Sequence, residues 1–122
     1  MPMQDRDVED LKERMKRFGL AIIRLAGKLP AGRIAGLIET QMVKSGTSAG
    51  ANYRAACRAR SRADFVSKMG IVEEELDETL YWLEVSLEAG FLLPVDVNGP
   101  AHEGNELLAI VVSSIRTARR RS

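Results

Sequence analysis

Apolar residues in the first quarter of the chain recur at intervals of three and four, the spacing that places them on one face of a helix. The series runs Val8, Leu11, Met15, Phe18, Ile22, Leu25 and Leu29. Pro30 and Gly32 follow directly. Because proline has no amide hydrogen and disfavours helix in the residue before it, the pattern predicts a first helix over residues 8–29 and then a short turn.

A second stripe at helical spacing is unusually rich in small residues. It runs Ile34, Leu37 or Ile38, Gln41 or Met42, Ser45, Ser48 or Ala49, Asn52 and Ala56. Gly46 and Gly50 lie beside it, although glycine costs about 1 kcal/mol relative to alanine inside a helix. We therefore expect these glycines to allow a close approach of a neighbouring backbone that offsets the loss.

Ser61 and Asp64 mark the start of a third helix. The hydroxyl can accept a hydrogen bond from an amide of the first turn, and the carboxylate favours the positive end of the helix. The apolar stripe then extends from Phe65 to Leu87, and Gly90 is typical of a helix end. These signals predict one long helix between the two boundaries.

Residues 93–104 contain Pro94, Asn98, Gly99 and Pro100 and predict a loop. A last helix is indicated by the spacing of Leu107 or Leu108, Val111, Ile115 and Ala118. With no convincing alternation at period two, the chain is expected to be all-α, an antiparallel up-down-up-down four-helix bundle.

The length and composition describe one globular domain. The 122 residues, 45% hydrophobic and 29% charged, predict a single domain over residues 1–122 with an ordered core over about 8–122. No apolar run approaches the roughly 18 residues that a membrane-spanning helix needs. The acidic start of the sequence also lacks the features of a signal peptide. We expect a cytoplasmic protein with no membrane contact.

The residues that usually carry catalysis are scarce. Cys57 and His102 are the single cysteine and the single histidine, which excludes an internal disulfide and leaves little for a metal site. Glu74 and Glu78 are one turn apart, but carboxylate-bridged metal sites in bundles use Glu-x-x-His, and the sequence has no such pattern. We expect no enzyme activity, no catalytic residue, no metal site and no cofactor.

The net charge of +1 hides a separation of charge along the chain. The third helix carries a run of acidic residues: Glu73, Glu74, Glu75, Asp77, Glu78, Glu84 and Glu88. We interpret this run as a solvated or interface face. Tyr81 and Trp82 lie within it and are interpreted as packing residues of the core or of a subunit interface.

An antiparallel bundle brings the end of the second helix, the start of the third and the end of the fourth to one end. The arginines placed there, called the arginine end below, are Arg54, Arg58, Arg60, Arg62, Arg116, Arg119, Arg120 and Arg121. Guanidinium groups pair with phosphates and release counterions, so one hypothesis is that this end binds RNA or DNA. The alternative is that the arginines complement helix C-termini and pair with acidic residues at the start of the chain. Tyr53 is the one aromatic residue that we place beside them, which favours backbone recognition over base stacking.

Two segments resemble a known family. They are residues 41–54 (QMVKSGTSAGANYR) and residues 59–84, which contain ARSRADF and the spaced Glu, Thr, Tyr and Trp residues that follow. They are similar to the second and third helices of bacterial four-helix-bundle proteins related to those encoded in intervening sequences of large-subunit ribosomal RNA genes. The likeness extends from about Leu11 to Arg120. Family members more often carry Glu three residues after Asn52, whereas this chain has Ala55, so any role of that acid is absent.

That family also resembles the accessory variability proteins of diversity-generating retroelements, which form pentameric rings and associate with nucleic acid and a reverse transcriptase. The resemblance implies a homo-oligomer, with five copies expected, whose acidic and small-residue faces contribute to subunit contacts. It also implies RNA or DNA, and a protein such as a reverse transcriptase, as partners. The rival reading is a structural or partner-binding scaffold with no specific nucleic-acid binding.

Overall fold

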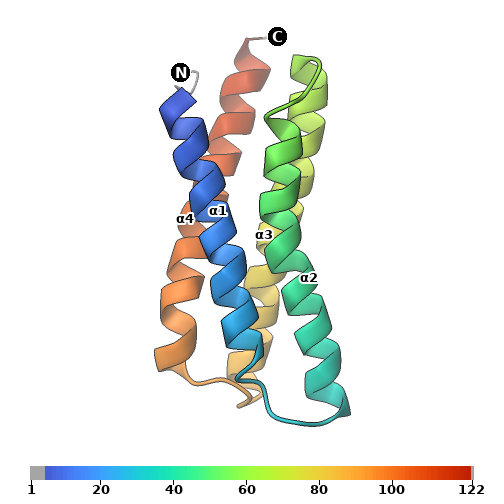
Figure 1. Cartoon of the computed structure of the whole chain (residues 1–122), viewed down its shortest axis with the longest axis vertical. Helices are drawn as coiled ribbons and strands as arrows, with labels where there is room; N and C mark the ends of the chain where they lie inside the picture. Colours follow the sequence, from blue (N-terminus) through green and yellow to red (C-terminus); the bar gives the residue numbers. More distant parts are fainter. Residues whose placement is uncertain (1–4, 122) are drawn as a thin grey trace.

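The computed structural model describes residues 5–121 and consists of four long helices (Figure 1). They are α1 (Asp5–Ala26), α2 (Arg33–Ala56), α3 (Arg62–Glu88) and α4 (Pro94–Arg120). Successive helices run in opposite directions, so the start of α1, the α2–α3 connection and the end of α4 lie together. No strand occurs in the described part of the chain, and none of these helices is both long and apolar enough to cross a membrane. The expected all-α antiparallel bundle is confirmed.

The apolar stripes of the four helices enclose one core. α2 packs against α1 and α3, and α4 packs against α3 and α1, which closes the bundle. In α1 the predicted stripe is buried from Leu11 to Leu25. α1 ends at Ala26, three residues before the predicted end, because the amides of Lys28 and Leu29 bond to carbonyls three residues earlier and tighten the chain into the turn.

The stripe predicted for α2 is wrong at its beginning. Ile34 is exposed and Ala35 is buried instead, whereas at the next predicted position, Leu37 or Ile38, it is Ile38 that is buried. Farther along, Tyr53 is buried, whereas Asn52 is only partly covered and donates to the backbone carbonyl of Ser48. Small residues leave the buried face of a helix undetermined by about one position, because several adjacent faces are then almost equally apolar.

The glycines of α2 allow α1 to approach closely, as the sequence predicts. A Cβ atom added to Gly46 would lie 2.7 Å from Cγ2 of Ile22, and one added to Gly50 would lie 3.4 Å from Cβ of Met15. α1 contributes Gly19, where an added Cβ would lie 3.2 Å from the carbonyl oxygen of Gly46. The two backbones therefore meet at a contact that larger residues would separate.

We expect Gly46→Ala to destabilise the protein by up to about 2 kcal/mol. Overpacking of a core costs about 1–3 kcal/mol, and the better helix propensity of alanine returns about 1 kcal/mol. The side chain of Ile22 cannot easily move, because its branched Cβ restricts χ1. Gly70→Ala in α3 is the matched control, since nothing lies within 4 Å of its added Cβ. It should be neutral or stabilising. Urea unfolding measures both, and equal effects would contradict this account of Gly46.

The loop predicted over residues 93–104 is wrong, because α4 begins at Pro94. Proline suits the first helical position, where its missing amide hydrogen would have no partner. Pro100 gives up a single helical hydrogen bond, to the carbonyl of Asp96. Packing offsets that loss: Val97 is buried, and Gly104 lies so close to Phe18 and Leu80 that a Cβ there would clash. Because the buried residues of this turn include glycine and alanine, the segment has no large apolar stripe.

The two predicted boundaries of α3 are confirmed. The hydroxyl of Ser61 accepts a hydrogen bond from the backbone N–H of Asp64 at 3.0 Å. At the other end Gly90 has φ of 75°, its amide donates to Leu87, and the amide of Phe91 donates to the carbonyl of Ser86. This pair of bonds satisfies the last carbonyls of the helix. Both boundaries depend on interactions between residues close in sequence, so they can be predicted from the sequence alone.

Candidate nucleic-acid interface

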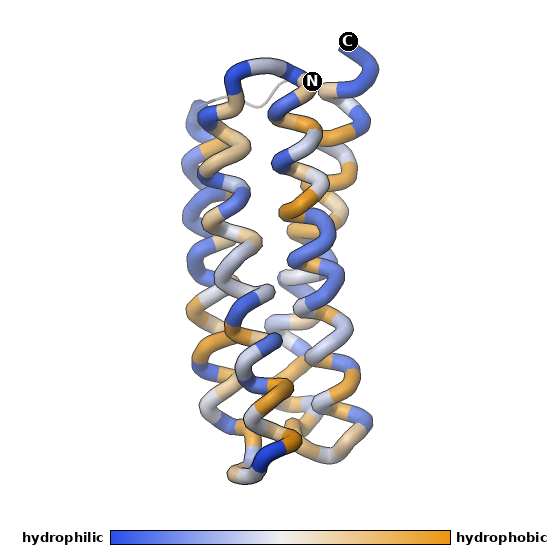
Figure 2. Tube along the Cα trace, turned by 90° about the vertical axis from the view of Figure 1, so that its right-hand side faces the viewer, coloured by the Kyte–Doolittle hydropathy of each residue, from blue (hydrophilic) through white to orange (hydrophobic). Residues whose placement is uncertain are grey.

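The fold brings the arginine end together. Figure 2 shows the α2–α3 connection, the start of α1 and the end of α4 at one end of the bundle, with hydrophilic segments there in blue. All eight of its arginines are exposed. Arg54 and Arg58 are one turn apart, while the neighbouring Tyr53 and Ala56 are buried. Burial of the apolar face of α2 therefore directs these guanidinium groups outward.

The α2–α3 connection, which carries Arg58 and Arg60, has a fixed shape. The carboxylate of Asp64 accepts hydrogen bonds from the backbone N–H of Arg60 at 3.2 Å and from Nζ of Lys68 at 2.7 Å. These bonds, the one from Lys68 first, hold the pKa of the Asp64 carboxyl below its ordinary value. With Ser61 capping the helix, the backbone around Arg60 is held and the arginine side chains remain free to meet a ligand.

None of the eight arginines forms an ion pair with a carboxylate of residues 5–121. Glu9, one of the carboxylates expected to pair with them, binds Lys12 instead at 3.0 Å. Arg119 and Arg120 do lie in the last turn of α4, where a positive charge is favourable. Arg62 is the first residue of α3, where the helix dipole disfavours it. Favourable interactions with helix C-termini therefore explain the positions of only some of the eight arginines.

Aromatic side chains at this end are turned into the core. Tyr53 is 2% exposed, and burial is the main cause that raises the pKa of its hydroxyl. Phe65, which the sequence analysis placed in the apolar stripe of the third helix but not beside the arginines, is partly buried against the core one turn into α3. The ring of Tyr53 is therefore not accessible to a base, and the ring of Phe65 is only partly accessible.

Sequence reasoning missed one cation of the arginine end. Arg6 lies in the first turns of α1, is exposed, and starts from the same end of the bundle as the eight predicted residues. The antiparallel argument that placed the others applies to it equally. Arg6 was missed because it lies between Asp5 and Asp7, and the segment was therefore interpreted as acidic.

The carboxylates of α3 lie along the side of the bundle, below the arginine end. Glu75 is partly covered, and desolvation together with the nearby Glu78 raises the pKa of its carboxyl. Among residues 5–121, no three histidine, cysteine, aspartate or glutamate side chains gather where they could hold a metal ion. His102 bonds to Glu106 at 2.9 Å on the exposed face of α4.

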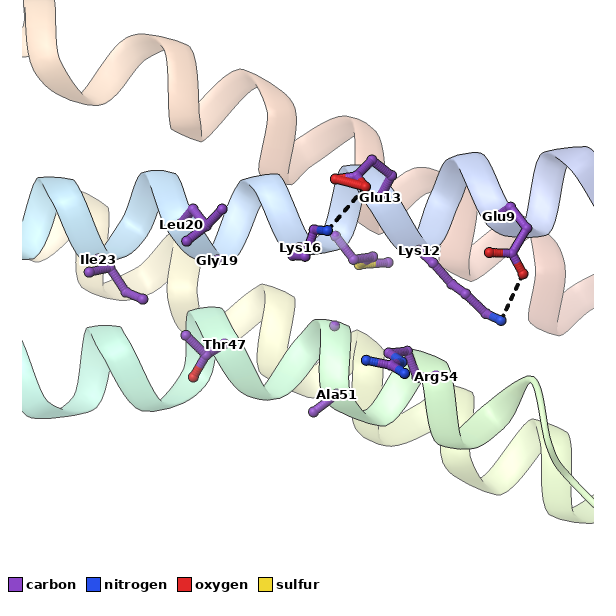
Figure 3. Close-up of a pocket in the computed structure, with 12 residues that line it drawn as sticks. Glu9, Lys12, Glu13, Lys16, Gly19, Leu20, Ile23, Thr47, Ala51 and Arg54 are labelled. Carbon is purple, nitrogen blue, oxygen red and sulfur yellow. Dashed lines mark hydrogen bonds and ion pairs between the residues drawn. The ribbon is translucent and has the colours of Figure 1, made fainter.

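A groove between α1 and α2 opens on the side of the bundle (Figure 3), with a volume of about 460 Å³. Its lining includes Gly19, Gly50 and Met15, together with Leu20 and Ile23. Lys12, Lys16 and Arg54 line it together with Glu9 and Glu13, and Arg54 belongs also to the arginine end. The groove exists because the residues at the contact of the two helices are small, so no large side chain fills the space between α1 and α2 at the surface.

The fold and this end define a four-helix-bundle protein with one strongly basic end. The family model of the 23S rRNA-intervening sequence proteins matches residues 9–113, and the chain belongs to that family. It is also similar to the crystal structure of a protein of unknown function from the S23 ribosomal protein family of Bacteroides thetaiotaomicron. The two are 31% identical, with a TM-score of 0.80, over 86% of this chain and 97% of the other. No protein of curated function matches the chain, and neither description names an enzyme activity.

Proposed function

We propose that this protein is a non-enzymatic, oligomeric bundle that binds the phosphates of RNA or DNA through its arginine end. The observation that carries the proposal is the set of eight exposed guanidinium groups without an intramolecular ion pair among the described residues. Crowded like charges repel one another, and that repulsion is relieved when phosphates bind. We place this binding in the cytoplasm.

The described aromatic residues favour recognition of the nucleic-acid backbone. Tyr53 is buried and Phe65 is partly buried against the core, so these two rings offer little surface for stacking on unpaired bases. Guanidinium groups on three separate chain segments can instead meet phosphates spaced along a duplex or a folded RNA. We therefore expect structured RNA and duplex DNA to bind at least as tightly as unstructured single strands.

Assembly would multiply the basic surface. The contact of one arginine end with a few phosphates is weak at physiological salt, since exposed charges are screened within about 8 Å. Several copies whose arginine ends face one way would engage one nucleic acid together, and avidity would raise the apparent affinity without any new kind of contact. Five copies, the number that the resemblance implies, form the oligomer that we propose.

Titration of labelled duplex DNA and structured RNA with the purified protein at several salt concentrations tests the proposal. Binding whose affinity falls steeply as salt rises supports it, because release of condensed counterions produces this dependence. Absence of binding at low salt would overturn it. The alternative is a structural or partner-binding scaffold, for which the apolar groove of α1 and α2 and the exposed Ile34 and Leu37 are the specific observations.

A further inference from the structure

The end of the bundle opposite the arginine end, called the apolar end below, exposes four large aliphatic side chains. It consists of the α1–α2 and α3–α4 connections with the first turns of α2 and α4 (Figure 1). The exposed fractions are 68% for Ile34, 64% for Leu37, 62% for Leu93 and 80% for Val95, the highest of any large hydrophobic residue in the described chain. A cluster of this kind on a soluble protein marks an interaction site, because each side chain leaves apolar area in water.

The core of the subunit does not use these side chains. Ala35 and Ile38 fill the buried face at the start of α2, and Leu92 and Val97 do the same at the start of α4. Each exposed residue lies within two positions of a buried one, so a rotation that covered it would expose its neighbour. The four side chains are therefore left for a partner outside the subunit.

A hollow and a projection adjoin each other at the apolar end. The hollow has a volume of about 630 Å³, and its lining includes Ile34, Leu37 and Phe91. Leu93 and Val95 follow Phe91 by two and four residues and form the projection, with Val95 the more exposed of the two. A surface that carries both shapes can pair with itself, because in a two-fold contact the projection of each copy meets the hollow of the other.

The charges around the apolar end have both signs. In the two connections and the two adjoining turns of each helix, the cations are Arg24, Lys28 and Arg33, and the carboxylates are Glu39, Glu84, Glu88 and Asp96. Lys28 pairs with Asp96 at 2.8 Å, and the other five form no ion pair within residues 5–121. An anionic lipid surface or a nucleic acid would meet more carboxylates than cations here. A second apolar end is complementary instead, since Arg33 at the hollow can meet Glu88 of the other copy.

We propose that the apolar end binds the apolar end of a second copy of this chain through a two-fold contact. Leu93 and Val95 of each copy enter the hollow of the other and cover Leu37 there. The two copies lie end to end, so their arginine ends point in opposite directions. At 1.5 Å per residue the 27 residues of α3 span about 40 Å, which places the two arginine ends about 80 Å apart. The contact goes beyond the proposed function, and the consequence that it joins two nucleic acids rests on that function.

Size-exclusion chromatography with light scattering tests the contact. The unaltered chain at about 100 micromolar should have a mass that is an even multiple of the 13.5 kDa of one copy. Leu37→Glu in the hollow and Val95→Lys on the projection should each halve that mass. Ile71→Glu is the matched control, because Ile71 is also an exposed aliphatic residue but lies in the half of α3 nearer the arginine end. The control should keep the mass of the unaltered chain.

The combined variant Leu37→Glu/Val95→Lys is the decisive arm. A two-fold contact brings the introduced carboxylate of each copy to the introduced ammonium group of the other, so this variant should regain the mass that each single change loses. Circular dichroism checks that every variant keeps its helices. The proposal is overturned by a single-copy mass for the unaltered chain, by unchanged mass in both single variants, by an equal fall in Ile71→Glu, or by a combined variant that stays at half mass.

Two further measurements separate this contact from a lipid partner and from the proposed function. The unaltered chain should stay in solution when vesicles of phosphatidylglycerol are sedimented, and sedimentation with them that Val95→Lys abolishes would overturn the proposal in favour of lipid. Capture of a labelled short duplex on an immobilised one should need the unaltered chain and be lost in Leu37→Glu, although both proteins bind one duplex equally. An end-to-end pair that binds no duplex overturns only the nucleic-acid role. A protein that binds a duplex but never pairs end to end overturns only the contact.

Discussion

Reversing two charges of the arginine end, in the variant Arg58→Glu/Arg62→Glu, is expected to weaken binding of duplex DNA and structured RNA by at least tenfold at low salt. Both guanidinium groups are exposed and form no ion pair with residues 5–121, so their positive charges are available to bind phosphates of the ligand. Each lost phosphate contact should lower the slope of log affinity against log salt by about 1, and two lost contacts by about 2 per copy.

A control at the opposite end distinguishes local contacts from overall charge. Arg24→Glu/Arg33→Glu changes the net charge by the same amount, and both residues are exposed at the α1–α2 connection, away from the arginine end. Fluorescence anisotropy of labelled nucleic acid over a salt series measures all three proteins. The control should retain most of the affinity and the slope. An equal loss in the two variants would show that binding follows net charge and would refute a dedicated arginine end.

The parts of the fold that the sequence predicts well depend on large side chains or on local backbone chemistry. The stripe of α1 consists of bulky residues such as Met15 and Phe18, and no other face of that helix is apolar enough to compete. Ser61 and Gly90 specify the ends of α3 through a hydroxyl and a positive φ, which need no knowledge of distant residues.

The errors fall where small residues make the pattern ambiguous. The first turns of α4 pack through Gly104 against Phe18, so the segment has neither a large apolar stripe nor a helix-forming composition. In α2 the same ambiguity affects single positions, since Ile34 was placed in the core and is exposed, and Tyr53 was left outside the core and is buried. Tertiary packing decides both cases, because a glycine contact adds stability only when the partner helix is present.

The arginine end could be inferred from topology, whereas the groove could not. Any antiparallel bundle with these helix boundaries brings Arg58 and Arg119 to the same end, whatever the helix rotations. The groove depends on how close α1 and α2 lie and on which residues then face outward, and both follow from the contact of Gly19 with Gly46. Exposure of Tyr81 likewise becomes visible only once the rotation of α3 is known.

The second large effect is expected in the core, where Thr79→Val should destabilise the protein by about 2 kcal/mol. The hydroxyl groups of Thr79 and Ser45 lie 2.8 Å apart between α2 and α3, and both residues are at most 1% exposed. Valine keeps the shape of threonine but leaves the Ser45 hydroxyl with a single 3.3 Å contact, to the carbonyl of Met42. The variant therefore removes the shorter of the two bonds of the Ser45 hydroxyl, and an incompletely bonded polar group in a core costs about 1–3 kcal/mol.

The double variant Ser45→Ala/Thr79→Val provides the decisive comparison. Removing both hydroxyl groups leaves no buried donor or acceptor of this pair unpaired, so the free energy of unfolding should recover most of the loss. Chemical unfolding of the native protein, the two single variants and the double variant completes the thermodynamic cycle. Additive losses would mean that the two hydroxyl groups act independently and that their hydrogen bond does not join α2 to α3. Recovery of the free energy of unfolding would show that the cost arises from leaving one hydroxyl group without the other. Water cannot replace the missing partner at this depth in the bundle.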